Sequence, residues 1–280
     1  MKYKIEKNTV QETLIIPLYA RKVCSELYPN LYRDETAVRL IDEIDYDFSE
    51  AEKNSRGLMQ RFGSLEVAMR QNDLAFEVRD YLKSHPNAAV VNLGCGLDST
   101  GRSCDNGSCK IYNLDLPDVI AVRNELLPSG EREENIPCNL NDTEWFRKID
   151  SSNGAAFFAS GVFYYFLIEQ VKALVQAMAD AFPGGVLVFD AANRTAVKMI
   201  AKTWLKSAKI KDVGAYFAVS DAPKEIGAWD GRLQVSSRGY MLGYNDLKDP
   251  SVSRFFRFLA KVGDGMMKMQ IVKIGFGGKQ

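Results

Sequence analysis

Histidine is almost missing from this 280-residue sequence, which contains only His85. Histidine is the side chain best suited to act as an acid or base near neutral pH, and it is the commonest metal ligand. His85 lies in the segment Ser84-His-Pro-Asn87, which is typical of a helix end and turn, so we expect it at the surface. The sequence therefore offers little to a mechanism that uses a catalytic histidine or a histidine-rich metal site.

Cysteine is also sparse, and its spacing is uninformative. The five cysteines are odd in number and include no Cys-x-x-Cys pair. Cys104 and Cys109 bracket the turn sequence Asp105-Asn-Gly-Ser108, so a disulfide or metal clip across a hairpin is one alternative. Free thiols are the favoured alternative, because disulfides are rare in a reducing compartment. We expect no metal site.

The sequence lacks both a surplus of positive charge and a long apolar run. Thirty-six Lys and Arg residues balance 36 Asp and Glu residues, which gives no sign of a nucleic-acid partner. No apolar stretch reaches the length of a membrane span, and the start, Met1-Lys-Tyr-Lys-Ile-Glu-Lys7, lacks the apolar core of a signal peptide. We therefore expect a cytoplasmic protein that binds neither nucleic acid nor membranes. Its 46% hydrophobic content is enough for a full core.

The most informative segment that is present ends at Asp115. The apolar residues 88–91 predict a buried strand that leads into the glycine-bent loop Gly94-Cys-Gly96. A second apolar strand ends at Asp115, about twenty residues after the glycines. This is the layout of a nucleoside site in an open α/β sheet, where glycines admit the ligand and the acid accepts hydrogen bonds from ribose hydroxyls. Asp115 could also cap the helix that Pro117 opens, and the two roles are compatible.

The same loop discriminates between nucleoside cofactors. A dinucleotide fingerprint has a third glycine where this sequence has Ser99. Asp98 also places negative charge where a pyrophosphate would bind the start of a helix. A cationic cofactor suits the loop better, and S-adenosylmethionine is the candidate. A nicotinamide-dependent oxidoreductase is the disfavoured alternative.

Strands and helices alternate along the chain. Helical periodicity is clearest at 167–182 and 64–83, and residues 12–47 are predicted to be helical with an interruption at 28–31. Apolar strands separated by helices predict the α/β doubly wound class, with a parallel sheet covered on both faces. We expect a helical insertion beside the site at 192–230. The predicted strands lie near 88–93, 109–114, 134–138, 155–160, 186–190, 233–240 and 267–276, with a tail helix at 251–262.

Five segments, in order, resemble the leucine carboxyl methyltransferase family, which includes carboxyl O-methyltransferases of polyketide biosynthesis. The resemblance covers nearly the whole chain. It implies the Rossmann-like fold of class I S-adenosylmethionine-dependent methyltransferases, with a mostly parallel seven-stranded sheet. We expect an N-terminal helical lid at 1–83, packed on a core at 84–280. The segments are Leu14-Ile-Ile-Pro-Leu-Tyr-Ala-Arg21, Asp34-Glu-Thr-Ala37, Val90-Val-Asn-Leu-Gly-Cys-Gly-Leu-Asp98, Asp115-Leu-Pro-Asp-Val-Ile120 and Gly161-Val-Phe-Tyr-Tyr165.

Arg70 is predicted to lie on the buried side of its helix. It is three residues after Val67 and four before Leu74, which places all three on one stripe. A buried guanidinium needs an anion. One alternative is Glu66, one turn earlier on the helix. The resemblance implies the other, because the family uses an arginine in this helix to bind the carboxylate of the cofactor's methionine moiety.

The resemblance assigns further residues to the cofactor. It places the ribose-binding acid at Asp115, and it implies that Arg21, on an N-terminal helix over the cofactor, has a role similar to that of Arg70. Asn139-Leu140 matches a family Asp-Leu pair that holds the adenine through its exocyclic amine and a backbone N–H. Asn139 keeps an acceptor oxygen and loses a charge, which is tolerable because adenine is neutral.

The sequence departs from the family pattern at Ser160. The family usually has Glu in a Glu-Gly-Val stretch after the fourth strand, whereas this chain has Ala159-Ser-Gly-Val162. The role of that Glu therefore does not carry over directly, and we expect Ser160 to alter the contacts with cofactor or substrate. Tyr164 and Tyr165 follow. One is expected to line the substrate pocket and the other to lie in the core.

A carboxylate acceptor suits a chain with so few catalytic side chains. S-adenosylmethionine is an activated donor, so positioning supplies most of the acceleration. A carboxylate, with a pKa of about 4, is already ionised and needs no base. We predict an O-methyltransferase acting on the carboxylate of a small or polyketide-like molecule, with a protein C-terminus as an open alternative. Because of Ser160, a non-catalytic protein that binds S-adenosylmethionine or S-adenosylhomocysteine is the other alternative.

Overall fold

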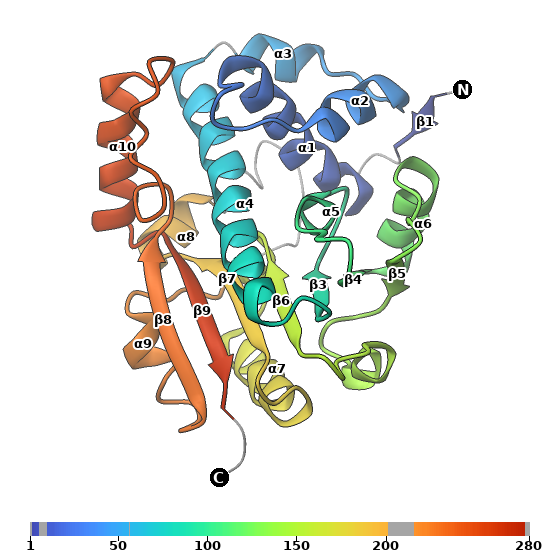
Figure 1. Ribbon diagram of the computed structural model, residues 1–280. Helices are drawn as coiled ribbons and strands as arrows, with labels where there is room; N and C mark the ends of the chain where they lie inside the picture. Colours follow the sequence, from blue (N-terminus) through green and yellow to red (C-terminus); the bar gives the residue numbers. More distant parts are fainter. Residues whose placement is uncertain (1, 6–9, 56, 201–215, 278–280) are drawn as a thin grey trace.

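A mixed seven-stranded sheet forms the centre of the protein. The computed structural model describes residues 2–5, 10–55, 57–200 and 216–277. The strand order is β5-β4-β3-β6-β7-β9-β8 (Figure 1). Strands β3 to β7 run parallel, whereas β9 is antiparallel to both of its neighbours, and β1 and β2 form a separate small ladder. The strands are β1 (Tyr3–Lys4), β2 (Ile44–Asp45), β3 (Ala89–Leu93), β4 (Lys110–Asp115), β5 (Glu133–Pro137), β6 (Ala155–Ala159), β7 (Val186–Ala191), β8 (Leu233–Gly239) and β9 (Gln270–Phe276).

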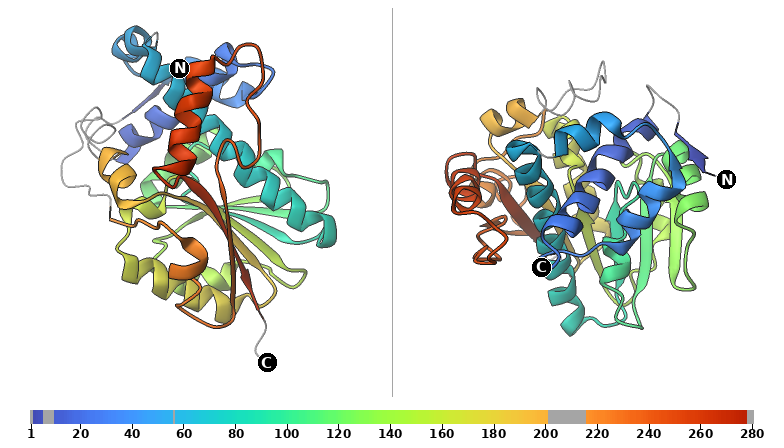
Figure 2. Two further views of the ribbon diagram at one scale, coloured as in Figure 1. Left: turned by 90° about the vertical axis from the view of Figure 1, so that its left-hand side faces the viewer. Right: turned by 90° about the horizontal axis from the view of Figure 1, so that it is seen from above.

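Helices cover both faces of this sheet. Figure 2 shows the sheet edge-on, with α4 on one side and α7 on the other. The helical elements are α1 (Val10–Leu27), α2 (Glu35–Glu43), α3 (Ser49–Ser55), α4 (Leu58–Ser84), α5 (Thr100–Ser103), α6 (Pro117–Leu126), η1 (Thr143–Lys148), η2 (Phe163–Tyr165), α7 (Ile168–Ala181), α8 (Arg194–Ile200), α9 (Ala222–Glu225) and α10 (Arg254–Gly265).

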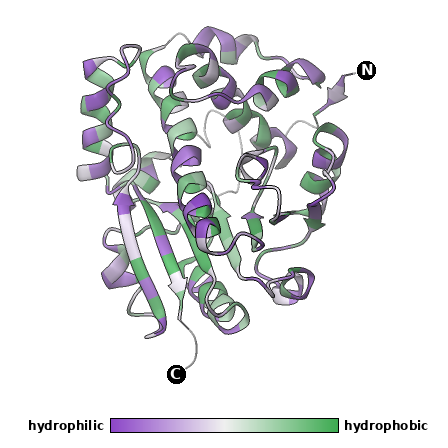
Figure 3. Ribbon diagram, in the orientation of Figure 1, coloured by the Kyte–Doolittle hydropathy of each residue, from purple (hydrophilic) through white to green (hydrophobic). Residues whose placement is uncertain are grey.

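The inner strands are apolar because both of their faces are buried. Every residue of β3, β6 and β7 is buried, and these strands are hydrophobic along most of their length in Figure 3. Alternate side chains belong to different cores: Val90 and Val188 pack in the cluster that includes α4, whereas Val91 and Phe189 pack in the cluster that includes α7. Burial on two faces thus explains why these strands lack an alternating polar pattern.

The N-terminal helices lie at the end of the sheet to which the parallel strands point (Figures 1 and 2). Leu14 and Leu18 of α1 share a buried cluster with Leu40 of α2 and Leu97 of the glycine loop. A Cβ added at Gly96 would lie 3.1 Å from Cδ2 of Leu14, so α1 packs directly over this loop. The division into a lid at 1–83 and a core at 84–280 stays a prediction, and α4 itself packs on the sheet through its contacts with β6 and β7.

The predicted α/β doubly wound fold with a mostly parallel seven-stranded sheet is confirmed. The long helix predicted at 64–83 begins earlier, at Leu58, and the stretch predicted as helical at 12–47 contains two helices, α1 and α2. The predicted insertion at 192–230 contains α8 and α9, and its residues 201–215 lie outside the described residues. Within the described ranges, no helix has the length and apolar character needed to cross a membrane.

Candidate active site

The glycine loop follows β3 and rests against the end of β4. The N–H groups of Gly94 and Cys95 donate to the carbonyl of Leu114 at 2.8 and 3.0 Å. Both glycines have positive φ, +68° at Gly94 and +45° at Gly96. A Cβ at Gly94 would lie 2.5 Å from Cγ2 of Val162, so side chains are excluded by space as well as by φ. The loop therefore depends on glycine, as predicted for a site where the backbone meets a ligand.

Asp115 ends β4 beside this loop. Its Oδ2 accepts the N–H of Gly96 and its Oδ1 accepts the N–H of Leu116, both at 2.8 Å. Burial raises the pKa of Asp115, against the lowering effect of these two N–H groups. A carboxylate has about four acceptor positions, so capacity for ribose hydroxyls remains. The N-cap of α6 is Leu116, without a side-chain cap, so Asp115 does not take the cap role that the sequence left open.

Arg70 pairs with an acid that is distant in the sequence. Its Nη1 lies 3.0 Å from Oδ2 of Asp190, the penultimate residue of β7, rather than in an ion pair with Glu66. The Asp190 side chain is 1% exposed and that of Arg70 is 16% exposed. Burial alone would lower the pKa of Arg70, but the Asp190 carboxylate and the nearby phenols of Tyr240 and Tyr164 together outweigh burial and raise that pKa. Arg70 is therefore a charged group held at the carboxyl end of the sheet.

Asp190 joins Arg70 to the turn after β6. Its Oδ1 accepts the N–H of Gly161 at 2.6 Å. Gly161 has φ +71°, and a Cβ there would lie 3.2 Å from both Nη atoms of Arg70, so the guanidinium lies against bare backbone. Burial, together with the neighbouring Asp190 carboxylate, raises the pKa of Tyr164 well above its usual value.

Arg70, Asp190, Ser160, Gly161 and Tyr164 make up what we call the Arg70 cluster. Two polar atoms in it are buried without a hydrogen-bond partner, Oγ of Ser160 and Nε of Arg70. Buried polar groups in proteins are nearly always satisfied, so such atoms call for a ligand or water. A hydroxyl and a guanidinium N–H suit the amino-acid end of S-adenosylmethionine, which carries an ammonium and a carboxylate. With the glycine loop and Asp115, the residues present fit this cofactor. When bound, S-adenosylmethionine would supply an activated methyl group at this end of the sheet.

Glu66 lies one helical turn from Arg70. Burial raises its pKa to about 7, and the guanidinium of Arg70 opposes that rise. The phenol of Tyr240 is also close, since the Glu66 carboxylate contributes to the raised pKa of Tyr240. The site thus contains one carboxyl group that is poised to exchange a proton near neutral pH.

Arg21 is buried beside the glycine loop. Its Nε pairs with Oδ2 of Asp34 at 2.9 Å, and its Nη2 donates to the carbonyl of Leu97 at 2.8 Å. Asp34 also caps α2 by accepting the N–H of Ala37. Arg21 therefore ties α1 and α2 to the loop, and direct contact with the cofactor stays a prediction.

Asn139 and Leu140 follow β5 at the same edge of the sheet. The N–H of Cys138 donates to the carbonyl of Asp115 at 2.8 Å, which places this segment beside the predicted ribose acid. Oδ1 of the exposed Asn139 accepts the N–H of Asn141 at 3.0 Å, and the Leu140 side chain is buried in the core. The predicted contact with adenine remains untested.

The two predicted pocket tyrosines differ in exposure. Tyr164 is 4% exposed and lies in the hydrophobic core that includes α4, next to the Asp190 carboxylate. Tyr165 is 49% exposed. Of the two, Tyr164 is the core residue that was expected, and a role of Tyr165 in the substrate pocket stays a prediction.

The single histidine lies away from this cluster, and the cysteines form no disulfide. His85 is the C-cap of α4, and its ring stacks on that of Tyr81 with 4.3 Å between the ring centroids. It lies near Gly154, just before β6, at the end of the sheet where the parallel strands begin. All five cysteines are free thiols, including Cys104 and Cys109. In the described part of the chain, no group of three or more His, Cys, Asp or Glu side chains is placed to hold a metal ion.

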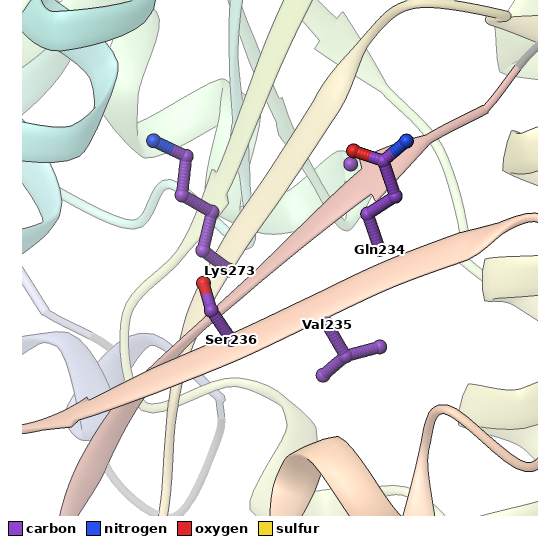
Figure 4. A pocket seen from close by; sticks show the side chains of 5 residues that line it. Gln234, Val235, Ser236 and Lys273 are labelled. Carbon is purple, nitrogen blue, oxygen red and sulfur yellow. The ribbon is translucent and has the colours of Figure 1, made fainter.

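A groove of about 340 Å³ lies elsewhere on the molecule (Figure 4). Its residues come from β8 and β9. In the register of the sheet, Lys273 of the groove lies opposite Val188, two residues before Asp190 on β7, and Ile271 lies opposite Asp190 itself. Lys273 is neutralised by Glu77, 2.8 Å away. The groove is therefore displaced from the Arg70 cluster and holds no free cation. It is lined by Gln234, Val235, Ser236, Lys273 and Gly275.

Sequence reasoning missed Asp190, although a signal was present. The segment Val186-Leu-Val-Phe-Asp190 has the same form as Ile111-Tyr-Asn-Leu-Asp115, an acid after a buried apolar strand. Carboxyl ends of parallel strands gather at one edge of a sheet, where ligands bind. The same rule that selected Asp115 would have selected Asp190.

This strand order, with a glycine loop and acids at the carboxyl edge, defines a class I methyltransferase fold. A solved structure of the plantazolicin methyltransferase BamL has the same fold, with a TM-score of 0.54, 13% identity, and coverage of 95% of this chain and 99% of that one. Residues 16–179, more than half of the chain, match the sequence profile of the leucine carboxyl methyltransferases. The chain belongs to the leucine carboxyl methyltransferase family, a family of S-adenosylmethionine-dependent enzymes.

Two relatives have named roles. The tetracenomycin polyketide synthesis O-methyltransferase TcmP of Streptomyces glaucescens is 28% identical over 183 residues, which cover 65% of this chain and 66% of that protein. The S-adenosyl-L-methionine-dependent methyltransferase dpfgK of Gibberella zeae is 25% identical over 258 residues, covering 86% of this chain and 85% of that protein. The predicted family, enzyme class and cofactor are thus confirmed.

Proposed function

We propose that this enzyme transfers the methyl group of S-adenosylmethionine to a carboxylate oxygen of a small or polyketide-like molecule. The observation that carries the proposal is that His85 lies at the end of the sheet where the parallel strands begin. The glycine loop and Arg70 lie at the opposite end, so His85 is not placed to act as a base there. A carboxylate is ionised at neutral pH and accepts a methyl group without a base. The name of the relative TcmP, a polyketide synthesis O-methyltransferase, supports a polyketide-like acceptor.

The stability of the product to alkali tests this proposal. Purified enzyme is incubated with S-adenosylmethionine labelled in the methyl group and with paired aromatic acceptors that differ only in bearing a carboxylic acid or a phenol. We expect label only in the acid, released as methanol by mild alkali. An alkali-stable product would overturn the carboxylate assignment, and the absence of transfer to any acceptor would favour the non-catalytic alternative.

Glu66 favours phenol methylation as a second candidate. A phenol must lose its proton near the transition state, and a carboxyl group with a pKa of about 7 suits that task. Glu66→Gln separates the two. If the acceptor is a carboxylate, kcat should stay within about threefold of wild type. If it is a phenol, loss of the base should lower kcat by about 100-fold or more.

A further inference from the structure

Asp190 is a buried acid to which the family resemblance assigns no role. It is 2% exposed and is the penultimate residue of β7. It accepts hydrogen bonds from the N–H of Gly161 and from Nη1 of Arg70, at 2.6 and 3.0 Å. Its carboxylate is therefore the anion around which the turn after β6 and the cation of α4 are arranged.

The sheet register places Ser160 next to Asp190. Strands β6 and β7 run parallel, with Ala159 opposite Phe189 as their last paired residues. Ser160 is the first residue after β6, and Asp190 follows Phe189 in β7. Asp190 pairs with Arg70 of α4, and it also accepts the N–H of Gly161, the residue after Ser160, at 2.6 Å, so the Ser160–Gly161 peptide lies against the Asp190 carboxylate. An acid at position 160 or at position 190 would therefore lie at the same end of the sheet. The resemblance places an acid at 160, and this chain has one at 190.

The chemistry of the cofactor explains why one acid is needed here. Its amino-acid end carries a carboxylate, which suits Arg70, and an ammonium, which a bare arginine would repel. Ser160 Oγ is an acceptor without a partner but carries no charge. We propose that Asp190 is the acidic positioning residue of the cofactor site. It holds Arg70 through Nη1, leaves Nε for the cofactor carboxylate, and supplies beside Ser160 the negative charge that the ammonium requires. This inference rests on the proposed binding of S-adenosylmethionine at this edge.

Calorimetry with two ligands tests the inference. The ligands are S-adenosylhomocysteine and its desamino analogue, which lacks the amino group. Asp190→Asn should weaken binding of S-adenosylhomocysteine by about 10- to 100-fold, as expected for a hydrogen bond to a charged group, and should weaken the desamino analogue much less. Ser160→Glu with Asp190→Asn, which moves the acid to position 160, should restore most of the lost affinity. Ser160→Glu alone should weaken binding, because two carboxylates would then lie side by side.

Two further variants keep the test decisive. Glu77→Gln is the control, because Glu77 is a buried acid of α4 that pairs with Lys273 away from this cluster, and it should leave both affinities unchanged. If Asp190→Asn does not fold, Ser160→Ala replaces it and should weaken S-adenosylhomocysteine by about 2- to 10-fold without affecting the desamino analogue. Equal loss of both ligands, or no rescue by Ser160→Glu, would overturn the role of Asp190. Failure of wild type to bind S-adenosylhomocysteine at all would instead refute the proposed function.

Discussion

Two aspartates, Asp115 and Asp190, each lie at the end of a buried strand, and they differ in what they hold. Asp115 accepts only backbone N–H groups, from Gly96 and Leu116. Asp190 accepts one backbone N–H and one guanidinium. Removing the Asp115 carboxylate therefore leaves two neutral backbone N–H groups without an acceptor. Removing Asp190 or Arg70 instead leaves the other member of the pair as an unpaired buried charge. The two sites should respond differently to mutation.

Asp115→Ala should weaken binding of S-adenosylhomocysteine by about 1–3 kcal/mol, since ribose hydroxyls would lose a charged acceptor. Calorimetry measures the change. Asp118→Ala, an exposed acid in the first turn of α6, is the matched control and should change affinity little. Equal effects from the two variants would contradict a ribose contact by Asp115.

Arg70→Met should weaken both cofactor binding and the fold. The sequence alone offered Glu66 or the cofactor carboxylate as the anion for Arg70, whereas the structure pairs Arg70 with Asp190 inside the protein. Breaking a buried pair typically costs about 3–5 kcal/mol of unfolding free energy. Urea unfolding measures it. Arg39→Met breaks the exposed pair with Glu43 and should cost less than about 1 kcal/mol. An unchanged stability in Arg70→Met would show that the pair is not formed.

At the scale of elements, α4 connects the site to the tail of the chain. Arg70 on this helix holds Asp190, and one turn later Oδ2 of Asp73 accepts the N–H of Met241, in the turn after β8. Met241 has φ +74°, which a non-glycine residue adopts only when its surroundings enforce it. Asp73 of α4 therefore fixes the turn that carries Tyr240 into the Arg70 cluster.

The glycine loop gives a prediction at the same scale. Gly94→Ala should lower the unfolding free energy by more than 2 kcal/mol, because the new Cβ would meet Val162 at 2.5 Å in a backbone with φ +68°. Gly107→Ala is the control. It also has positive φ, +86°, but nothing lies within 4 Å of its added Cβ, so it should cost only about 1 kcal/mol. Thermal melts that rank the two variants the other way would contradict the packing argument.

The whole molecule should be less stable above neutral pH than below it. Burial raises the pKa of Asp73, Asp264 and Glu66 to about 7, above the value of about 4 in an unfolded chain. Between these values the folded state binds more protons, so the unfolding free energy falls as pH rises from 4 to 7. Histidines also titrate close to this window, and the sequence contains only one.

Melting temperatures at pH 5.5 and 8 test this expectation. Wild type should melt at the higher temperature at pH 5.5, and Asp73→Asn should reduce the difference, because one of the groups that take up protons is gone. Asp118→Asn, an exposed acid, should leave the difference unchanged. A wild-type melting temperature that rises between pH 5.5 and 8 would refute the prediction.

The sequence by itself determined the sheet and the glycine loop, because both depend on local patterns. Apolar runs bounded by glycine and proline marked strands such as 186–190, and Gly94-Cys-Gly96 with Asp115 marked the nucleoside site within a short stretch of chain. Helical spacing also put Arg70 on a buried stripe. Helix starts were less certain, since packing rather than periodicity decides where α4 begins.

Only the tertiary structure decided what Arg70 pairs with. Its partner Asp190 lies 120 residues away, on β7, and also accepts the N–H of Gly161, the residue after Ser160. Periodicity along one helix could suggest only Glu66, the neighbour one turn away. Arg21 is similar, since its bond to the carbonyl of Leu97 spans 76 residues and follows from the packing of α1 over the loop. Contacts of such separation are fixed by how elements pack, and no local pattern encodes them.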